Sequence, residues 1–391
     1  MSVCGIVCEC NPFHNGHAAL LSAVRRRGAE TIVCAMSGNF VQRGEPAIVS
    51  KLARAEMAVR GGADLVLELP TPWATDTAER FARGGVSVLA MAGCDAIAFG
   101  SESGDTAALI KTAAITAARD FPRQVTARMA DGTPYAAARQ QAAEAMGTAT
   151  GLLRCPNDIL AVEYLKAAAA EGVDITPIVI PRIGPAHDGE PVDGIASASF
   201  IRRLLIEGND KAFTFMPPYG TEILRREREK GTFPVDITNA ERAVLDRLRR
   251  MGEADFAAFD SGGEGLYRRL YRAVGEATSL HELLEAVKTR RYPTARLRRM
   301  LLRCWLGVEN TPDRVPYLRV LAANDAGRRH LRKLRDSGAP VLTKAADVAA
   351  LGPEAETLLG QEARYTDLYA LCCPRVQRPG GEWRITPYMA L

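Results

Sequence analysis

The pattern of apolar and polar positions divides the chain into two parts. In the first 210 residues, short apolar and often β-branched runs alternate with longer stretches of helical periodicity. This alternation is typical of an α/β domain with a doubly wound, Rossmann-like parallel sheet that carries helices on both faces. The predicted strands cover residues 3–8, 31–35, 65–68, 96–99 and 175–180, and the helices between them include residues 49–61, 78–92 and 158–170.

Strand signals fade after residue 214, and amphipathic helical patterns take over. They cover residues 221–230, 240–251, 279–289, 295–306 and 326–337. We therefore expect a doubly wound domain over residues 1–210, followed by a mostly α-helical second domain over residues 211–391.

Composition limits the class of protein. With 391 residues, 47% of them hydrophobic and 25% charged, the chain resembles a soluble globular protein. No apolar run reaches eighteen residues and no secretory leader is evident, so we expect a cytoplasmic protein that does not enter a membrane. The nine cysteines are odd in number and mostly lie in apolar runs, which predicts reduced core residues. Since no cysteine pair has ligand spacing and no His-Glu-x-x-His occurs, we predict no protein-bound metal.

Charge is distributed unevenly between the two parts. Residues 1–210 carry 19 Lys and Arg against 23 Asp and Glu, a net charge of −4, whereas residues 211–391 carry 31 against 23, a net charge of +8. The densest basic segment, residues 288–303, has no acidic side chain and has Tyr292 and Trp305 nearby. Arginine interleaved with aromatic residues favours RNA binding, although a solvated helix surface would give the same charge pattern. The basic residues of this segment are Lys288, Arg290, Arg291, Arg296, Arg298, Arg299 and Arg303.

Two histidines follow the first predicted strand directly. His14 and His17 stand three residues apart in a turn that contains Pro12 and Gly16, just before a helical stretch. If His14 lies in the turn and His17 begins the helix, both can face an anion held by the free N–H groups of the helix end. We therefore predict that these histidines contact a nucleotide phosphate, through charge or hydrogen bonds.

Polar clusters also follow the other predicted strands, where doubly wound domains bind their ligands. They are residues 37–46, residues 100–105 and residues 181–188, the last including Arg182, His187 and Asp188. A further segment places Ser197 and Ser199 before a helix, with Arg202 one turn inside it. Either serine could cap this helix, and Arg202 could reach the same phosphates as the first helix end.

Together these segments resemble a known family. Residues 11–17 (NPFHNGH) and 195–202 (IASASFIR) resemble the paired signatures of the HIGH-motif nucleotidyltransferases, and nearly the whole chain resembles the bacterial tRNA(Met) cytidine acetate ligases. Ala196 and Ala198 depart from the Ser and Thr common in the second signature, and Cys10 replaces a bulkier residue. The further matching segments are residues 36–47, 50–51, 64–70, 99–102, 156–160 and 290–299.

The resemblance implies an ATP-dependent ligation of acetate to the exocyclic amine of the wobble cytidine in elongator tRNA(Met). The implied intermediate is acetyl adenylate and the products are N(4)-acetylcytidine, AMP and pyrophosphate. It also implies that ATP contacts the segment from Val7 to Leu20 together with Gly100, Asn157 and Arg182. Within that segment we single out Val7, Cys8, Glu9, Asn11, Pro12, Phe13, His14, Asn15, Gly16, His17 and Leu20.

The expected roles follow from this family pattern. His14, His17 and Arg202 are the predicted catalytic residues, with Ser197 and Ser199 as further phosphate contacts and Mg²⁺ bridging phosphate oxygens. Two alternatives are a small-molecule adenylyltransferase that ignores RNA and a tRNA-binding protein with a vestigial nucleotide site. The sequence leaves the oligomeric state open. We expect acetate near Ser37, Gln42 and Lys51, and tRNA at Arg290, Arg291, Arg296, Arg298 and Arg299.

Overall fold

The computed structural model describes residues 2–130, 132–182, 191–192, 194–260, 265–289 and 292–390. Two sequence predictions lie outside these ranges. One concerns His187 and Asp188 in the loop after Arg182, and the other concerns Arg290 and Arg291 of the basic segment.

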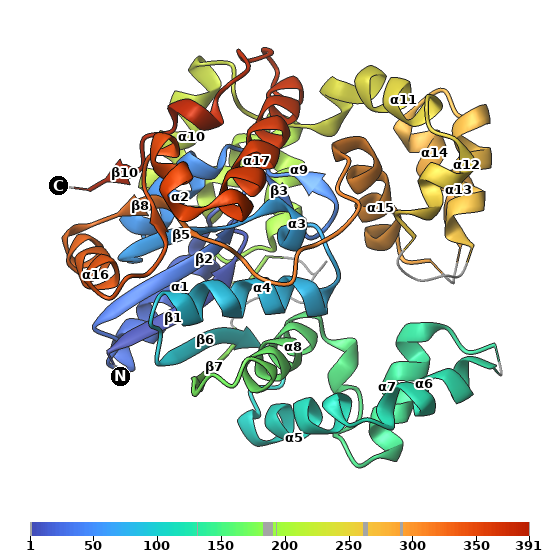
Figure 1. The fold of residues 1–391 in the computed structure, drawn as a ribbon, viewed down its shortest axis with the longest axis horizontal. Coiled ribbons are helices and arrows are strands. Elements are labelled where there is room, and N and C mark those ends of the chain that lie inside the picture. Colours follow the sequence, from blue (N-terminus) through green and yellow to red (C-terminus); the bar gives the residue numbers. More distant parts are fainter. Residues whose placement is uncertain are drawn as a thin grey trace.

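A central sheet organises the described part of the chain (Figure 1). Its strand order is β10-β8-β5-β2-β1-β6-β7, with β9 paired to the outer side of β8. The five predicted strands are confirmed and all run parallel, because helical crossovers connect them. They are β1 (Val3–Cys8), β2 (Thr31–Ser37), β5 (Leu65–Leu69), β6 (Ala96–Ser101) and β7 (Thr176–Pro181).

The sheet also contains strands from the second half of the chain, which the sequence pattern did not predict. Strand β8 (Leu318–Ala323) is buried at every position and pairs antiparallel with β5. Beside it lie β9 (Val341–Leu342) and β10 (Tyr388–Met389), both parallel to β8. The expected division at residue 210 did not include this return of the chain to the sheet.

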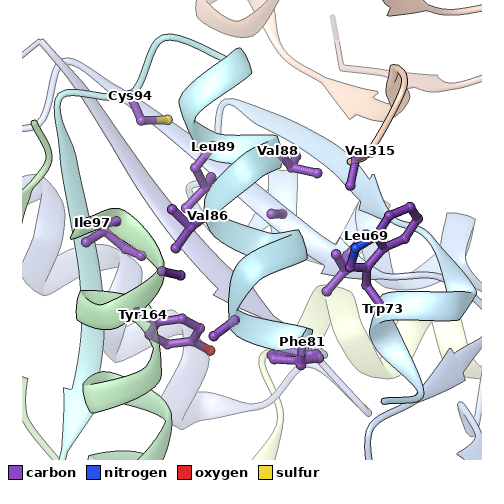
Figure 2. Close-up of a cluster of buried hydrophobic side chains, with 14 of the residues drawn as sticks. Leu69, Trp73, Phe81, Val86, Val88, Leu89, Cys94, Ile97, Tyr164 and Val315 are labelled. Carbon is purple, nitrogen blue, oxygen red and sulfur yellow. The ribbon is translucent and has the colours of Figure 1, made fainter. Parts of the chain in front are cut away.

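Helices cover both faces of the sheet and enclose two apolar cores. On one face, Val86 and Leu89 of α4 lie near Ile97 of β6 and Tyr164 of α8 (Figure 2). Helix α4 approaches β1 closely at Gly85, where a Cβ would meet the Val7 side chain at 2.7 Å. This face is covered by α4 (Ala78–Met91), α8 (Pro156–Ala170) and α16 (Asp325–Asp336), and the other by α1 (Asn15–Arg26), α2 (Lys51–Arg60), α9 (Ala198–Ile206) and α10 (Pro218–Glu229).

A third apolar core holds together the helical lobe at the right of Figure 1. The lobe comprises α11 (Glu241–Arg249), α12 (Glu253–Ala257), α13 (Leu266–Glu276), α14 (Leu280–Val287) and α15 (Thr294–Leu306). Helix α17 (Pro353–Leu371) contributes Leu358 and Leu359 to the core on the α4 face, and Tyr365 and Tyr369 to the core of the lobe. It therefore ties the lobe to the sheet.

The remaining elements are short or peripheral. Helices α5 (Thr106–Ala117), α6 (Phe121–Ala130) and α7 (Tyr135–Ala145) form an insertion before α8, and α3 (Thr71–Ala74) follows β5. The two-stranded hairpin of β3 (Phe40–Val41) and β4 (Glu45–Pro46) lies between β2 and α2. All nine cysteines are free, and most are buried, as predicted. Among the described helices, none has the length and apolarity needed to cross a membrane.

Candidate active site

His14 and His17 form the start of α1. The helix begins at Asn15, two residues earlier than predicted, so His14 is its N-cap and His17 is its third residue. The N–H of Gly16 donates to Nδ1 of His14 at 3.0 Å, and the N–H of His14 donates to Nδ1 of His17 at 3.3 Å. Because each Nδ1 accepts a backbone hydrogen bond, Nε2 carries the proton in both neutral rings. The site therefore has two Nε2–H donors at a helix N-terminus.

Both imidazoles are neutral near pH 7. Burial lowers the pKa of His17 to about 4, with a further contribution from Arg182. Burial also lowers the pKa of His14 well below its usual value, assisted by His17, Arg182 and Arg202. The nearby arginines supply the positive charge, and the histidines supply neutral hydrogen-bond donors. Both kinds of group suit a polyphosphate.

Helix α9 brings a second N-terminus to the same place. Ser197 is its N-cap and accepts from the N–H of Phe200 at 3.2 Å. One turn later, the Arg202 guanidinium donates to the carbonyl oxygen of Asn11 at 2.8 Å and lies 3.5 Å from Oγ of Ser199. The structure thus brings the two signatures together, with Arg202 against the turn that carries the histidines.

The residues predicted after β6 and β7 also lie together. Strands β6 and β7 pair in register up to Ser101 and Pro181, which places Gly100 and Arg182 at one sheet edge. The carboxylate of Glu102 accepts from Nδ2 of Asn157 at 2.6 Å and lies 3.7 Å from the Arg182 guanidinium. A Cβ on Gly100 would meet no atom within 4 Å, so the backbone there faces open space. Glu102, which we had not singled out, is the link between the other residues.

A buried carboxylate fixes the loop that follows β6. Asp158, at the start of α8, accepts from the N–H groups of Glu102 and Ser103, both at 3.1 Å, and from the hydroxyl of Ser101. These bonds satisfy the backbone of the loop after β6 and attach it to the N-terminus of α8. Asn157 and Gly100 are consequently held on two elements that cannot shift independently.

Comparison with known proteins identifies the family of this chain. A family model described as HIGH Nucleotidyl Transferase matches residues 1–382. The tRNA(Met) cytidine acetate ligase of Caldicellulosiruptor saccharolyticus is 35% identical over 95% of this chain and 94% of its own length. The protein of the same name from Acetivibrio thermocellus is 35% identical over 98% of both chains. This chain belongs to the tRNA(Met) cytidine acetate ligase family.

Solved structures agree with this family. The chain resembles apo Thermotoga maritima TmcAL with a TM-score of 0.92 and 30% identity, over 100% of this chain and 99% of that one. The same protein bound with α-thio ATP gives a TM-score of 0.91 at 30% identity, with the same coverage. The predicted fold class, an α/β nucleotidyltransferase fold with helical additions, is confirmed.

Lys51 is one of the residues predicted to lie near acetate, but its side chain does not face open space. Its side chain is 2% exposed, and its ammonium lies 2.6 Å from carboxylate oxygens of Glu68 and of Glu382. Nearby, Glu362 accepts from Thr71, and burial raises the pKa of this carboxyl to about 8. Lys51 is therefore a buried counterion that joins the C-terminal segment to β5, because its charge is already paired.

Ser37 and Gln42 lie closer to the nucleotide site. Ser37 ends β2 and is fully buried, and its hydroxyl makes no hydrogen bond within the described residues. The N–H of Gln42 donates to the Glu9 carboxylate at 2.7 Å, next to the end of β1. Of the predicted acetate residues, these two lie beside the ends of β1 and β2.

The sequence analysis missed Arg54, which shapes the centre of the site. Its fully buried guanidinium donates to the carbonyl oxygens of Glu9 at 2.5 Å, Ser37 at 3.1 Å and Val49 at 3.1 Å, and also to that of Gly38. The side chain thereby holds the ends of β1 and β2 at a fixed spacing. An arginine on the apolar face of a predicted helix was the signal that could have found it.

The predicted RNA-binding arginines of α15 differ from one another. Arg298 is exposed, whereas Arg299 is half-buried and donates to the carbonyl oxygen of Gln42 at 3.2 Å. Arg296 is half-buried and lies 3.4 Å from Asp260. Arg303, also in the basic segment, is buried and donates to the carbonyl oxygen of Pro72 at 3.1 Å. Several of these arginines thus have structural partners, and Arg298, whose side chain is 45% exposed, is the most open to solvent of these four.

Proposed function

We propose that this protein ligates acetate to the exocyclic amine of the wobble cytidine in elongator tRNA(Met), forming N(4)-acetylcytidine through acetyl adenylate. The observation that supports this most is the convergence of two helix N-termini, carrying His14 with His17 and Ser197 with Arg202. It occurs in a chain that aligns over nearly its full length with tRNA(Met) cytidine acetate ligases. A tRNA substrate would place the reaction in the cytoplasm.

In the first proposed step, a carboxylate oxygen of acetate attacks the α-phosphorus of ATP. The new bond is P–O(acetyl), and the bond between the α-phosphorus and the bridging oxygen breaks, so that its electron pair leaves on pyrophosphate. The Nε2–H groups of His14 and His17 and the Arg202 guanidinium donate to the phosphate oxygens as charge moves onto them. Since acetate is itself the nucleophile, the step needs no covalent bond to the enzyme.

In the second proposed step, the N4 amine of cytidine attacks the acetyl carbonyl carbon. A C–N bond forms, the C–O bond to the phosphate breaks with its electron pair on AMP, and the amine passes a proton to solvent water. Holding the amine and the acyl group together in one site is itself a large contribution to rate. The exposed charge of Arg298 on α15 supports an approach of the tRNA backbone from the side of the helical lobe.

Mg²⁺ is part of this proposal as a partner of ATP. Within the described residues, no three His, Cys, Asp or Glu side chains gather in a way that could hold a metal ion. This fits an ion that binds phosphate oxygens and water, as Mg²⁺ commonly does with nucleotides. When bound, it would neutralise polyphosphate charge, while His14 and His17 orient the α-phosphate and Arg202 pairs with the phosphates that leave as pyrophosphate.

Two buried polar atoms without hydrogen-bond partners support an acetate position near the end of β2. They are Oγ of Ser37 and Nδ2 of Asn11, while Oδ1 of Asn11 accepts from the N–H of Ile48 at 2.8 Å. Buried polar groups normally have hydrogen-bond partners, and these two donors are available to a small anion. We propose that the acetate carboxylate takes these donors after a local opening.

The test is acetate-dependent exchange of labelled pyrophosphate into ATP, followed by mass spectrometry of nucleosides from a tRNA(Met) transcript. We expect exchange that requires acetate, and N(4)-acetylcytidine when tRNA is added. Exchange without any modified cytidine would favour the small-molecule adenylyltransferase. Tight tRNA binding with neither exchange nor product would favour a non-catalytic binding protein.

A further inference from the structure

The β3–β4 hairpin connects the nucleotide site to the helix predicted to bind RNA. At its turn, Gly44 has a φ of +75°, and a Cβ there would overlap the backbone of Arg298 and Arg299. The hairpin is therefore seated directly on α15, which lies beside it (Figure 1). At its other side, the N–H of Gln42 donates to Glu9 at the end of β1.

One carboxylate in this hairpin is shared by two arginines. Oε1 of Glu45 lies 2.9 Å from Nη2 of Arg202, and Oε2 lies 3.5 Å from Nη1 of Arg298. The side chains of Arg202 and Glu45 are 13% and 21% exposed, whereas that of Arg298 is 45% exposed. Arg202 belongs to the nucleotide signature, and Arg298 is the solvent-facing arginine of the basic segment. Glu45 is thus the counterion of both in the absence of ligands.

We propose that Glu45 couples the two sites by serving as the shared counterion of Arg202 and Arg298, so that ATP and tRNA weaken each other's binding until pyrophosphate has left. A polyphosphate that takes Arg202 leaves Glu45 paired with Arg298. An RNA phosphate that takes Arg298 leaves Glu45 paired with Arg202. When both anions are bound, Glu45 keeps neither partner, and a half-buried carboxylate without a partner is costly.

The coupling gives the proposed reaction an order. Once pyrophosphate leaves, Arg202 is free to return to Glu45, which releases Arg298 to bind RNA. The acetyl-adenylate form would then bind tRNA more tightly than the ATP form. This inference rests on the proposed function for the identity of the ligands, but it concerns the binding energies and not the chemical steps.

The experiment measures tRNA(Met) affinity with and without a saturating non-hydrolysable ATP analogue. We expect the analogue to weaken tRNA binding to the unaltered protein by about fivefold, the lower end of typical coupling between two sites. Because linkage is reciprocal, saturating tRNA should weaken analogue binding by the same factor. In Glu45→Gln and, separately, in Arg298→Gln, the ratio of the two tRNA affinities should fall to about one.

Asp313→Asn is the matched control. Asp313 also lies between two arginines, 3.4 Å from Arg80 and 3.8 Å from Arg83, but it is 81% exposed and belongs to neither site. Its variant should keep the fivefold ratio of the unaltered protein. An equal tRNA affinity with and without analogue, or an unchanged ratio in Glu45→Gln, overturns the coupling. Neither result contradicts the proposed function. The proposed function is contradicted if the unaltered protein shows no acetate-dependent exchange of pyrophosphate into ATP.

Discussion

The Arg202 guanidinium donates a hydrogen bond to the carbonyl oxygen of Asn11 at 2.8 Å, across 191 residues of sequence. Asn11 precedes the histidine turn, and Arg202 lies one turn into α9. This bond links the two helix N-termini of the candidate site, which also share one apolar core. The site therefore binds a ligand across two elements that are set in place before the ligand arrives.

Replacing His17 by Ala should lower acetate-dependent pyrophosphate exchange by roughly 10²-fold, because one preorganised donor to the phosphate is lost. The variant also loses the acceptor for the N–H of His14, so we expect a loss of about 1 kcal/mol in the free energy of unfolding. Exchange rates and thermal unfolding measured on the same sample separate the two effects. His281→Ala, an exposed histidine on α14, should change neither. A fall in exchange that merely tracks unfolding would reject the assignment.

The histidine turn should also make the folded state sensitive to acid. A histidine whose pKa is lower in the folded chain binds fewer protons there than in the unfolded chain, so stability falls as the pH falls. For His17 this window runs from about 6.5 in the unfolded chain to about 4 in the folded one. The slope is up to about 1.4 kcal/mol per pH unit for each such residue. Denaturant unfolding at several pH values should show a flatter dependence in His17→Ala, and parallel curves would contradict this.

Arg54→Ala should destabilise the protein by about 3 kcal/mol or more, since four buried carbonyl oxygens lose their donor. Urea denaturation gives the loss directly. Arg60→Ala provides a comparison on the same helix, where the side chain is 30% exposed and pairs with Glu222. That change should cost less than about 1 kcal/mol. Similar losses for the two variants would show that Arg54 does not hold the strand ends.

Arg298→Ala should weaken tRNA binding and reduce the slope of log affinity against log salt by about one, the effect of one lost phosphate contact. Arg299→Ala should instead lower the thermal midpoint, because its guanidinium supports the carbonyl oxygen of Gln42. Titrations of tRNA(Met) at several salt concentrations distinguish the two. If the slope is unchanged in Arg298→Ala, the charge on α15 is an ordinary solvated surface.

Sequence reasoning succeeded where the relevant residues are neighbours in the chain. The four strands β1, β2, β5 and β6 are mostly buried, and all five parallel strands are short, largely apolar runs followed by a polar loop. The His14 and His17 turn and the Ser197 cap are likewise local features. Their meeting could be predicted because the ends of parallel strands share one edge of the sheet.

Sequence reasoning did not reach features that depend on a residue far away in the chain. We expected acetate near Lys51, and the ion pair of Lys51 with Glu382, 331 residues away, could not be predicted from the sequence. Strand β8 is a short apolar run among helices, and its place beside β5 is fixed by tertiary packing. Glu45 lies in the polar segment 37–46 that follows the second predicted strand, but its role could not be predicted, since that role depends on two arginines on separate helices.

The return of β8 to the sheet has a consequence for how the protein can be divided. A fragment ending at residue 210 would leave the edge of β5 bare, with backbone groups open to pairing with other chains. It would also leave Lys51 and Glu68 without the carboxylate that Glu382 supplies. During synthesis, the sheet therefore reaches its full width only after strand β10 has left the ribosome. We expect a fragment of residues 1–210 to aggregate and not to bind a nucleotide.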